Sequence, residues 1–364
     1  MNHEALMARA IRLARHGLYT TEPNPRVGCV LVKNGRIVGE GFHARAGQGH
    51  AEVQALADAG SDARGSTAYV TLEPCSHTGR TPPCADALIK AGVTQVVAAM
   101  TDPNPLVAGC GLARLRDAGI TVLSGVLEAQ ARALNPGFIK RMQTGLPWVR
   151  IKLASSLDGR TAMASGESVW ITGPAARADV QRLRARSGCV LTGSGTVRYD
   201  NPSLNVRLSA EELGIDGEVR QPLRAVIAGR GDIDPAAKLF SLPGPVRVYS
   251  RVPFRLSRAC DSNVVSAGEG HLPLRPVLED LAALGVNEVH VEAGAGLAGA
   301  LVGAGLADEI VLYMACHLMG DEGLPLFRLP GLQAMHERLA LELQEVRQIG
   351  VDLRLVLRPA APGA

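Results

Sequence analysis

The pattern of apolar and polar residues changes its period along the chain, and the changes mark a succession of helices and strands. At the N-terminus, MNHEALMARAIRLARHG spaces its apolar residues as an amphipathic helix does, and Gly17 predicts its end. Two short apolar runs at 27–33 and 37–41 flank Asn34-Gly35, which is typical of a type I′ hairpin. The chain is therefore expected to begin with a helix and two antiparallel strands.

Residues 1–145 are expected to form one α/β unit. Helices and short apolar strands alternate at about 50–59, 67–73, 83–91 and 94–100, and a further helix is expected from about 127. Gly60, Gly92 and Gly119 each follow a helical segment, where glycine commonly ends a helix. The boundary of the unit is expected near 144–147, in the stretch TGLP.

A second α/β unit is expected over 146–364. Its pattern predicts strands at 148–153, 188–193, 223–228, 246–250, 287–292 and 309–315, and helices at 174–186, 276–284 and 296–304. The segment 201–222 is expected to be a polar loop. Two final strands, 339–346 and 351–357, are expected to pair in antiparallel fashion on either side of Gly350.

Composition narrows the classes of protein to which the chain can belong. With 364 residues, of which 46% are hydrophobic, it can build two cores. A net charge of +3 and 3% aromatic residues give no support to nucleic-acid binding. Seven scattered cysteines, an odd number, indicate reduced thiols and a cytoplasmic protein. No apolar run reaches about 18 residues, so no membrane span is expected.

Three short motifs together predict a catalytic zinc site. His50-Ala51-Glu52 is followed by Pro74-Cys75 and Pro83-Cys84, with a C-x8-C spacing. One imidazole and two thiolates suit Zn²⁺ and leave a fourth position for water, whereas structural sites fill that position with a side chain. Glu52 would not bind the metal and would carry the proton. Zinc deaminases that act on nucleobases have this pattern, although with a shorter C-x-x-C spacing.

Local arguments leave alternatives for each zinc motif taken alone. Both cysteines are placed where a helix could begin, which would favour the thiolate. His50 and Glu52 are two positions apart, and on a regular helix they would point in nearly opposite directions. A lone His of this kind is more often a cap or core residue, and an isolated Cys is usually a small hydrophobe. The joint occurrence of the motifs favours one Zn²⁺ per chain, with a purely structural zinc as the main alternative.

A glycine-rich segment in the second unit allows two interpretations. Residues 294–299 form a literal G-x-G-x-x-G between a predicted strand and a predicted helix. A Rossmann unit is not favoured, because the motif lies near the end of its domain and no acidic residue ends the next strand. The glycines either bind phosphate at the start of the helix or allow the helix to pack closely on its neighbour.

Longer motifs in both units resemble the family of bifunctional riboflavin biosynthesis deaminase-reductases. In the first unit these are Asn24-Pro25, Gly41-Phe42-His43, His50-Ala51-Glu52, TLEPCSHTGRTPPC at 71–84 and DPNPLVAG at 102–109. In the second unit they are ASSLDGR at 154–160, SVWIT at 168–172, DNPSL at 200–204 and Glu292-Ala293-Gly294. The resemblance covers nearly the whole chain, and the long spacer between the two cysteines is its most specific part.

The resemblance implies a cytidine-deaminase-like domain at 1–145 and a dihydrofolate-reductase-like domain at 146–364. The first would remove the 2-amino group of 2,5-diamino-6-ribosylamino-4(3H)-pyrimidinone 5′-phosphate by hydrolysis. The second would reduce the ribosyl group with NADPH, giving 5-amino-6-(5-phosphoribitylamino)uracil. In the deaminase it implies a zinc site and substrate contacts: the ligands His50, Cys75 and Cys84, the catalytic Glu52, and contacts from Asn24, His43, Arg80, Asp102 and Asn104.

For the reductase the resemblance implies two sets of contacts. The nucleotide contacts are Ala154, Trp170, Thr196, Asp200 and the run Gly294, Ala295, Gly296, Leu297, Ala298, Gly299 and Ala300. The substrate contacts are Ser168, Arg184, Leu204, Arg207 and Glu292. From the residues alone, Arg184 and Arg207 can also be surface charges, Trp170 a core residue and Asp200 a turn former. Where the family has Asp followed by Ser or Thr, this chain has Ala228-Gly229, and a hydroxyl is missing.

The bifunctional enzyme is favoured over two alternatives. One is a deaminase whose reductase-like domain only binds ligand or assembles the oligomer. The other is a nucleic-acid deaminase or a zinc-stabilised binding module, which the small net charge disfavours. The expected partners are a small phosphorylated pyrimidine and further copies of the chain, with a dimer favoured, and neither nucleic acid nor membrane.

Overall fold

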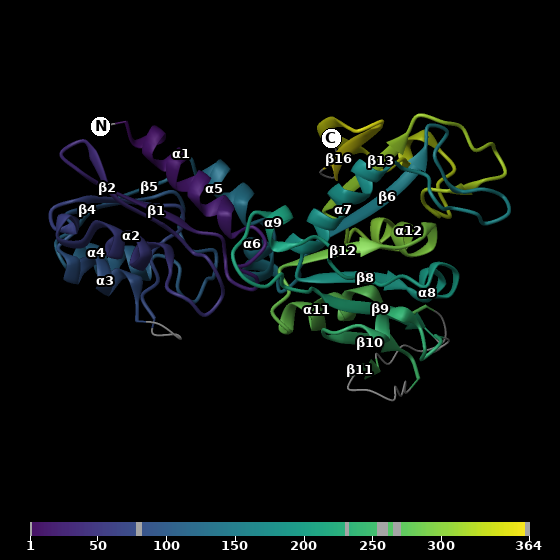
Figure 1. Cartoon of the computed structure of the whole chain (residues 1–364), viewed down its shortest axis with the longest axis horizontal. Coiled ribbons are helices and arrows are strands. Elements are labelled where there is room, and N and C mark those ends of the chain that lie inside the picture. Colours follow the sequence, from purple (N-terminus) through teal and green to yellow (C-terminus); the bar gives the residue numbers. More distant parts are fainter. Residues whose placement is uncertain (1, 78–81, 230–232, 253–260, 265–270, 361–364) are drawn as a thin grey trace. The chain divides into compact units, whose positions relative to one another are not determined.

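The protein folds into two compact units, Met1–Leu146 and Pro147–Ala364. The structure is a computed structural model that describes residues 2–77, 82–229, 233–252, 261–264 and 271–360 (Figure 1). We call the two parts the N-terminal unit and the C-terminal unit. Within the described residues, no helix has the length and apolar character that a membrane crossing requires.

The N-terminal unit is a five-stranded sheet with helices on both faces (Figure 1). The strand order is β2-β1-β3-β4-β5, in which β1 is antiparallel to β2 and β3, while β3, β4 and β5 are parallel. Its elements are α1 His3–Ala14, η1 Arg15–Gly17, β1 Gly28–Lys33, β2 Arg36–Phe42, α2 Ala51–Ala59, η2 Gly60–Ala63, β3 Thr67–Val70, α3 Cys84–Ala91, β4 Gln95–Ala98, α4 Cys110–Asp117, β5 Thr121–Ser124, α5 Glu128–Leu134 and α6 Pro136–Thr144.

Two glycines allow helices to approach this sheet from opposite sides. A Cβ atom on Gly28 of β1 would lie 2.0 Å from the carbonyl oxygen of Ala10 in α1. A Cβ atom on Gly41 of β2 would lie 2.5 Å from the carbonyl oxygen of Ala51 in α2. Gly41 pairs with Cys29, the neighbour of Gly28, and successive residues of a strand face opposite sides. Therefore α1 and α2 cover opposite faces, and the apolar core of the unit lies between each helix and the sheet.

In the N-terminal unit the predicted hairpin is confirmed, and one predicted helix is wrong. Asn34 and Gly35 have φ of 52° and 76°, as the hairpin between β1 and β2 requires. The single helix expected from about 127 is wrong, because α5 ends before Asn135 and α6 begins at Pro136. Proline has no N–H for a helix interior, and the buried Asn135 side chain instead exchanges hydrogen bonds of 2.8 and 2.9 Å with the main chain of Arg26.

The C-terminal unit is built on a nine-stranded sheet of order β11-β10-β9-β8-β12-β6-β13-β16-β15. All neighbours are parallel except β16, which is antiparallel to both β13 and β15, so the predicted C-terminal pair is confirmed. The elements are β6 Trp148–Ser156, β7 Arg160–Ala162, α7 Pro174–Arg186, β8 Cys189–Gly193, α8 Ser194–Asp200, α9 Ala210–Leu213, β9 Leu223–Gly229, α10 Lys238–Ser241, β10 Val246–Ser250, β11 Asp261–Val264, α11 Leu274–Ala283, β12 Glu288–Glu292, α12 Ala295–Gly303, β13 Glu309–Ala315, β14 Leu324–Pro325, η3 Met335–Glu337, β15 Leu341–Ile349 and β16 Asp352–Pro359.

The sequence pattern predicted a loop over 201–222, but this segment is not entirely a loop. It contains the short helix α9, which begins at a capping box formed by Ser209 and Glu212. One turn of helix is too short to leave a periodic signal in the sequence. The same reason explains why α10, β7 and β14 were not predicted.

The two faces of the nine-stranded sheet differ in polarity. On one face, the guanidinium of Arg150 in β6 is buried between the carboxylates of Glu288 in β12 and Glu309 in β13, and Arg186 of α7 pairs with Glu288 at 3.1 Å. The helix α7 therefore lies over a buried ion-pair network. On the opposite face the register places aliphatic residues of the same three strands, namely Val289, Val291, Ile151, Leu153, Ile310 and Leu312.

Candidate active sites

The zinc motif lies at one edge of the five-stranded sheet. Because β3 and β4 are parallel, the segments that follow them emerge at the same edge. Cys75 follows β3, and Asp102 follows β4. His50 and Cys84 lie at the starts of α2 and α3, which bring them to Cys75.

Three donor atoms have the spacing that zinc requires. His50 Nδ1, Cys75 Sγ and Cys84 Sγ all lie within 4.8 Å of one another. The Nδ1 atom is 3.7 Å from the sulfur of Cys75 and 3.3 Å from the sulfur of Cys84. In a tetrahedral site with Zn–N of about 2.1 Å and Zn–S of about 2.3 Å, such donors are about 3.6 Å apart. The residues present therefore fit one Zn²⁺ held by one nitrogen and two sulfurs.

The start of α2 explains how His50 and Glu52 both face the same point. His50 is the N-cap, with extended backbone angles (φ −72°, ψ 170°), so its side chain does not follow the helical direction. Glu52 lies in the first turn of α2 and is buried. The objection that a regular helix would separate them does not apply, because only one of the two residues is helical.

The two cysteines differ in their local structure. Cys84 is the first residue of α3 and follows Pro83, as predicted. The expectation that Cys75 also begins a helix is wrong, because it lies in an irregular segment after β3. Its sulfur instead accepts the backbone N–H of Cys84 at 3.3 Å, so that Cys75 receives the first N–H of a helix to which it does not belong.

Hydrogen bonding and burial set the ionisation of this cluster. The hydrogen bond from the Cys84 thiol lowers the pKa of Cys75 to about 4, and the same bond raises the pKa of Cys84. Burial raises the pKa of Glu52 to about 7, with a further contribution from the negative charge of Cys75.

Asn24 and His43 lie beside the cluster, where the resemblance placed substrate contacts. Asn24 Nδ2 is 3.0 Å from His43 Nε2, and His43 Nδ1 is 3.3 Å from the carbonyl oxygen of Gly49. The imidazole of His43 therefore donates from Nδ1 to Gly49 and accepts at Nε2 from Asn24. Its ring is perpendicular to that of His50, with centroids 5.2 Å apart. Arg80, another predicted substrate contact, lies outside the described residues.

A buried carboxylate fixes the loop that carries Asp102 and Asn104. Glu73 lies two residues before Cys75 and accepts four backbone N–H groups, from Asp102, Gly109, Gly111 and Leu112, at 2.8 to 3.2 Å. Asp102 in turn accepts the N–H of Asn104 at 2.8 Å. The same short segment that supplies a predicted zinc ligand therefore holds the two predicted substrate contacts in place.

A second cluster lies on the α7 face of the nine-stranded sheet. Glu292 lies at the end of β12, and its carboxylate accepts a hydrogen bond from Arg184 Nη2 at 2.8 Å. Its other carboxylate oxygen is 3.3 Å from His290 Nε2. Burial opposes the charged form of Glu292, but Arg184 holds its pKa well below the usual range. Arg184 is 7% exposed, so its interpretation as a surface charge is wrong.

Lys152 belongs to the same cluster and was not predicted. It is the register partner of Glu292 on β6, and burial lowers its pKa, while the charge of Glu292 raises it. Its signal in the sequence is a lysine inside the otherwise apolar strand WVRIKLA, two positions after Arg150. Glu73 has a similar signal, since it is a charged residue within the apolar stretch YVTLEPC. In both cases a buried charge requires a partner.

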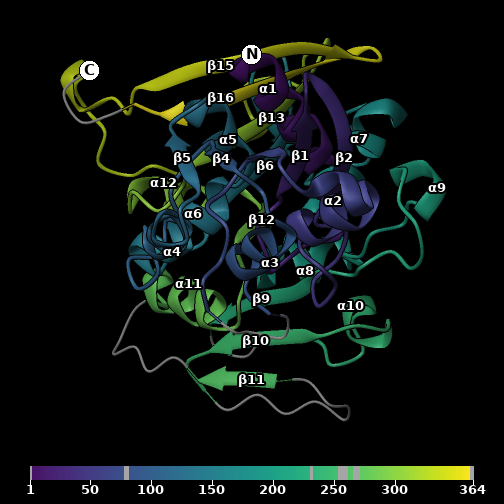
Figure 2. The same ribbon diagram turned by 90° about the vertical axis from the view of Figure 1, so that its left-hand side faces the viewer.

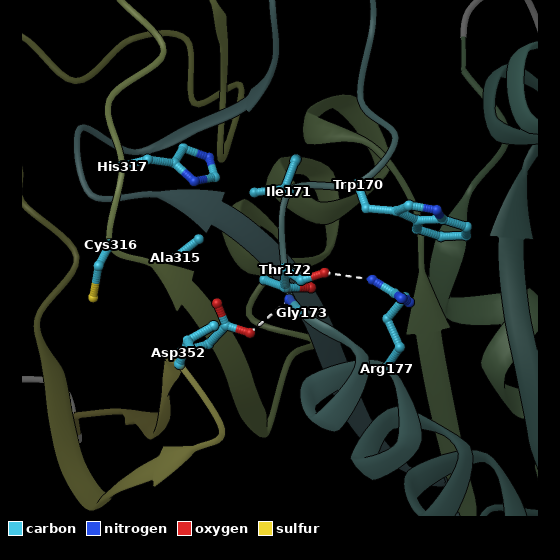
Figure 3. Close-up of a pocket in the computed structure, with 10 residues that line it drawn as sticks. Trp170, Ile171, Thr172, Gly173, Arg177, Ala315, Cys316, His317 and Asp352 are labelled. Atoms are coloured by element: carbon cyan, nitrogen blue, oxygen red, sulfur yellow. Dashed lines mark hydrogen bonds between the residues drawn. The ribbon is translucent and has the colours of Figure 1, made fainter.

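The side chain of Trp170 is exposed at the edge of a cavity of about 420 Å³ (Figure 3). Its exposed fraction is 70%, so its interpretation as a core residue is wrong. The guanidinium of Arg177 in α7 stacks on the indole at 4.5 Å and donates to the carbonyl oxygen of Thr172 at 2.7 Å. The remaining wall comes from the end of β13 and the turn between β15 and β16, including His317 and Asp352.

The glycines of residues 294–299 serve two different purposes. Cβ atoms added at Gly294 and Gly296 would meet nothing within 4 Å, so the start of α12 is open. A Cβ atom on Gly299 would lie 2.1 Å from the carbonyl oxygen of Arg328, and Ala298 is fully buried. The first two glycines leave room for a ligand at the helix start, whereas Gly299 allows close packing.

The other predicted reductase residues lie near these elements. Ala154 is on β6, Ser168 precedes Trp170, Thr196 is in α8, and Asp200 ends α8 next to Asn201 with φ of 40°. Leu204 is 1% exposed, so only its backbone can reach a ligand. Arg207 is exposed at the surface. Partial burial of its side chain lowers its pKa, and the positive charge of Arg184 lowers it further. Ala228 is buried and Gly229 ends β9, so no hydroxyl stands there.

Comparison with known proteins assigns both units. Residues 1–100 match the cytidine and deoxycytidylate deaminase zinc-binding region, and residues 147–355 match the RibD C-terminal domain. Riboflavin biosynthesis protein RibD of Escherichia coli (strain K12) is 50% identical over 366 residues, which cover 98% of this chain and 99% of that protein. The chain belongs to the RibD family. The Haemophilus influenzae RibD is 51% identical over 97% of this chain and 96% of its own length.

Solved RibD structures have the same fold. Acinetobacter baumannii RibD superposes with a TM-score of 0.91 at 47% identity, covering 98% of this chain and 99% of that chain. The deaminase and reductase from Thermotoga maritima gives 0.87 at 33% identity, with the same coverage. The predicted fold class is confirmed, with a cytidine-deaminase-like domain followed by a reductase domain. The chain is a deaminase and reductase of riboflavin biosynthesis, and an inactive reductase-like domain is not supported.

Removing either sulfur should remove the metal. We expect close to one zinc ion per wild-type chain, and Cys75→Ala or Cys84→Ala should lose both zinc and ammonia release, because two donors do not hold Zn²⁺ as tightly as three. Elemental analysis of the purified variants measures the metal. Cys29→Ala, a buried cysteine outside the cluster, is the control and should keep it. Full zinc in both site variants would contradict the assignment.

Glu52→Gln should separate metal binding from chemistry. The amide keeps the shape of the side chain but cannot carry a proton, so ammonia release should fall by roughly 10²-fold or more while zinc stays bound. Ammonia release and zinc content should be measured on the same sample. Undiminished deamination would remove Glu52 from the mechanism.

Glu73→Gln should weaken the deaminase without affecting the metal. In the wild-type protein both carboxylate oxygens of Glu73 accept backbone N–H groups. In the variant an amide nitrogen, which is a donor, replaces one of these oxygens and leaves its N–H partners without an acceptor. The free energy of unfolding should therefore fall by roughly 2–4 kcal/mol. Because the loop of Asp102 and Asn104 would loosen, KM for the pyrimidine should rise more than kcat falls. Glu128→Gln, an exposed residue of the same domain, is the matched control. Unchanged KM and stability would show that the four hydrogen bonds are dispensable.

Proposed function

We propose that the N-terminal unit hydrolyses 2,5-diamino-6-ribosylamino-4(3H)-pyrimidinone 5′-phosphate and that the C-terminal unit then reduces the ribosyl group with NADPH. The observation that carries the first step is the placement of a buried carboxyl group, Glu52, beside three donors that fit zinc. The product of the two steps is 5-amino-6-(5-phosphoribitylamino)uracil. The Thermotoga relative is a diaminohydroxyphosphoribosylaminopyrimidine deaminase and 5-amino-6-(5-phosphoribosylamino)uracil reductase, which supports this substrate class.

The deaminase residues have separate tasks. His50, Cys75 and Cys84 would hold Zn²⁺, which supplies Lewis acidity and makes water a nucleophile at neutral pH. Glu52 takes a proton from the attacking water and delivers it to the leaving amine. Asn24 fixes His43, and both lie where they can contact the pyrimidine. Asp102 and Asn104, held by Glu73, contact the substrate from the segment after β4, at the same edge of the sheet as Cys75.

The reductase residues fit NADPH and a phosphorylated substrate. The open first turn of α12 at Gly294, Ala295, Gly296 and Leu297 presents N–H groups that have no partner inside the helix and suit phosphate. NADPH supplies the hydride when bound. Trp170, Ala154, Thr196 and Asp200 would line the nucleotide.

The substrate of the reductase would lie over the cluster of Glu292. Arg184 directs two nitrogens at Glu292 and a third at the carbonyl oxygen of Asn205, so it mainly orients the carboxylate. The backbone N–H of Arg207 donates to Gln181 at 3.0 Å, and its guanidinium has a weak contact to Ser203 at 3.4 Å, so this guanidinium is better placed to hold the substrate phosphate. Ser168 and the backbone of Leu204 complete the set of contacts. We further propose that the chain forms a homo-oligomer, with a dimer favoured.

One assay tests both steps. Purified protein is given the diaminopyrimidine substrate and NADPH, while ammonia and NADPH absorbance are followed together. Both signals should change in sequence, since the reductase uses the deaminated product. If ammonia is released but NADPH is never oxidised, the missing hydroxyl at Ala228-Gly229 becomes the first suspect.

The two activities should fail independently. Gly296→Val places a branched side chain in open space, so the protein should fold normally while NADPH binds at least tenfold more weakly, or about 1.4 kcal/mol. Deamination should be unchanged. Gly303→Val, the same substitution at the far end of α12, is the matched control and should bind NADPH normally. Glu52→Gln should show the reverse pattern when given the deaminated pyrimidine.

A further inference from the structure

The motif ASSLDGR at 154–160 supplies only its first residue to the predicted contacts, although the residues after it make several contacts of their own. It includes the end of β6, which pairs in parallel with β13, and Ser156 and Ala315 are the last pair of the register. Figure 2 shows the two strands in the same sheet. Since parallel strands end at one edge, residues 157–172 after β6 and 316–329 after β13 leave the sheet together. We call them the β6 loop and the β13 segment.

Asp158 joins the β6 loop to the β13 segment. Its carboxylate accepts the backbone N–H of Met319 at 3.1 Å and that of Gly320 at 2.8 Å, and it also accepts the hydroxyl of Ser156. The hydrogen bond from Ser156, together with those from Gly320 and Met319, lowers the pKa of Asp158 to about 2. The carboxylate is therefore charged at neutral pH and acts only as an acceptor.

Apolar packing contributes little to this connection. Leu157 and Leu318, which are the neighbours of the bonded residues, are 58% and 72% exposed. The N–H of Leu157 instead donates to the carbonyl oxygen of His317 at 2.9 Å. Hydrogen bonds to a charged acceptor are stronger than those between neutral groups. The contact between the β6 loop and the β13 segment therefore depends chiefly on the carboxylate of Asp158.

The short strands β7 and β14 continue the connection beyond Asp158. They pair in antiparallel fashion, and the hydroxyl of Thr161 is 3.3 Å from the carbonyl oxygens of both Leu324 and Pro325. A Cβ atom on Gly323 would lie 2.9 Å from the carbonyl oxygen of Ala162, so the two chains approach closely there. A two-stranded pair is marginally stable by itself, and this one therefore relies on the contacts beside it.

The far end of the β13 segment reaches the first turns of α12. The N–H of Arg328 donates to the carbonyl oxygen of Ala295 at 3.0 Å. Gly299 packs against the same residue, since a Cβ atom there would lie 2.1 Å from the carbonyl oxygen of Arg328. The β13 segment thus contacts the β6 loop at one end and, at the other, the helix start to which we assign the nucleotide phosphates.

The cavity beside Trp170 has walls from the same two segments. The β6 loop contributes Trp170, Ile171 and Thr172, while the β13 segment contributes Cys316 and His317, as Figure 3 shows. A cavity whose walls belong to separate segments changes its width when the segments move apart. The hydrogen bonds of Asp158 oppose that movement, although Asp158 is not among the residues that line the cavity.

We propose that Asp158 is a positioning residue of the reductase, which holds the β6 loop against the β13 segment so that Trp170 and the start of α12 meet NADPH together. The inference rests on the NADPH-dependent reduction proposed above. A nucleotide that contacts both places binds best when they are already in position, because binding then carries no cost of ordering them. Asp158 acts through these segments and need not touch the nucleotide.

The kinetics of Asp158→Asn test the proposal with the deaminated pyrimidine as substrate. The variant has no charge and places an amide nitrogen, a donor, beside backbone donors. The Kd and KM for NADPH should rise roughly tenfold, since only a fraction of the molecules would hold the two segments in the binding arrangement. The kcat at saturating NADPH should fall by less than about threefold, because bound nucleotide restores that arrangement.

This pattern differs from that of a merely structural defect, which would lower kcat through loss of folded protein and leave KM unchanged. Asp321→Asn is the matched control, because Asp321 is an exposed residue of the β13 segment, and it should keep the wild-type KM. Deamination should be unchanged in both variants. Wild-type Kd and KM in Asp158→Asn would overturn the role of Asp158 alone. A wild-type protein that neither binds nor oxidises NADPH would contradict the proposed function and this inference with it.

A second measurement covers the case in which Asp158→Asn does not fold. Amide hydrogen exchange of the wild-type protein reports how often each segment opens. Saturating NADPH should slow exchange in peptides 157–163 and 319–325 together, because a ligand that binds the connected state stabilises it. Peptide 110–117 of α4, in the N-terminal unit, should not change. Exchange in 157–163 and 319–325 that does not respond to NADPH, or responds in only one of them, would overturn the proposal.

Discussion

Parallel pairing of strands is the constraint on which both sites depend. In a parallel pair the carboxyl ends of the two strands lie at one edge of the sheet. Residues that are distant in sequence therefore come together there because of the strand pairing, and not because they attract one another. In the N-terminal unit this brings Cys75 and Asp102 to the same edge. In the C-terminal unit the same rule places Glu292 and Gly193 at the ends of β12 and β8, and the register places Lys152 of β6 beside Glu292. The helices that follow or precede these strands add the remaining groups.

The predicted zinc cluster and the loop of Asp102 and Asn104 are connected through Glu73. A carboxylate that accepts four backbone N–H groups leaves little freedom to the segments it joins. The connection runs from Cys75 through Glu73 to Asp102 over a few bonds of one chain. The position of the loop that carries Asp102 is therefore tied to that of Cys75, the predicted zinc ligand.

The sequence pattern predicted those features that depend on neighbouring residues. The hairpin at Asn34-Gly35, the main strands of both sheets and the three zinc ligands all have local signals, and the resemblance added their likeness to a known family. Contacts between distant residues have no such signal. Asn135 holds Arg26 across 109 positions, and Arg184 meets Glu292 across 108, so neither pairing could be read from periodicity. The interpretation of Trp170 as a core residue was wrong for the same reason. The exposed fraction of a side chain depends on residues that are distant in sequence.

The buried network of Arg150, Arg186, Glu288 and Glu309 has a consequence for how the chain can change. Loss of one member leaves a charge buried without its partner, which costs about 3–5 kcal/mol, whereas replacing the whole set by apolar residues can be neutral. Stepwise substitution therefore passes through an unstable intermediate. A related chain that lacks one of the four charged residues should therefore lack the others as well.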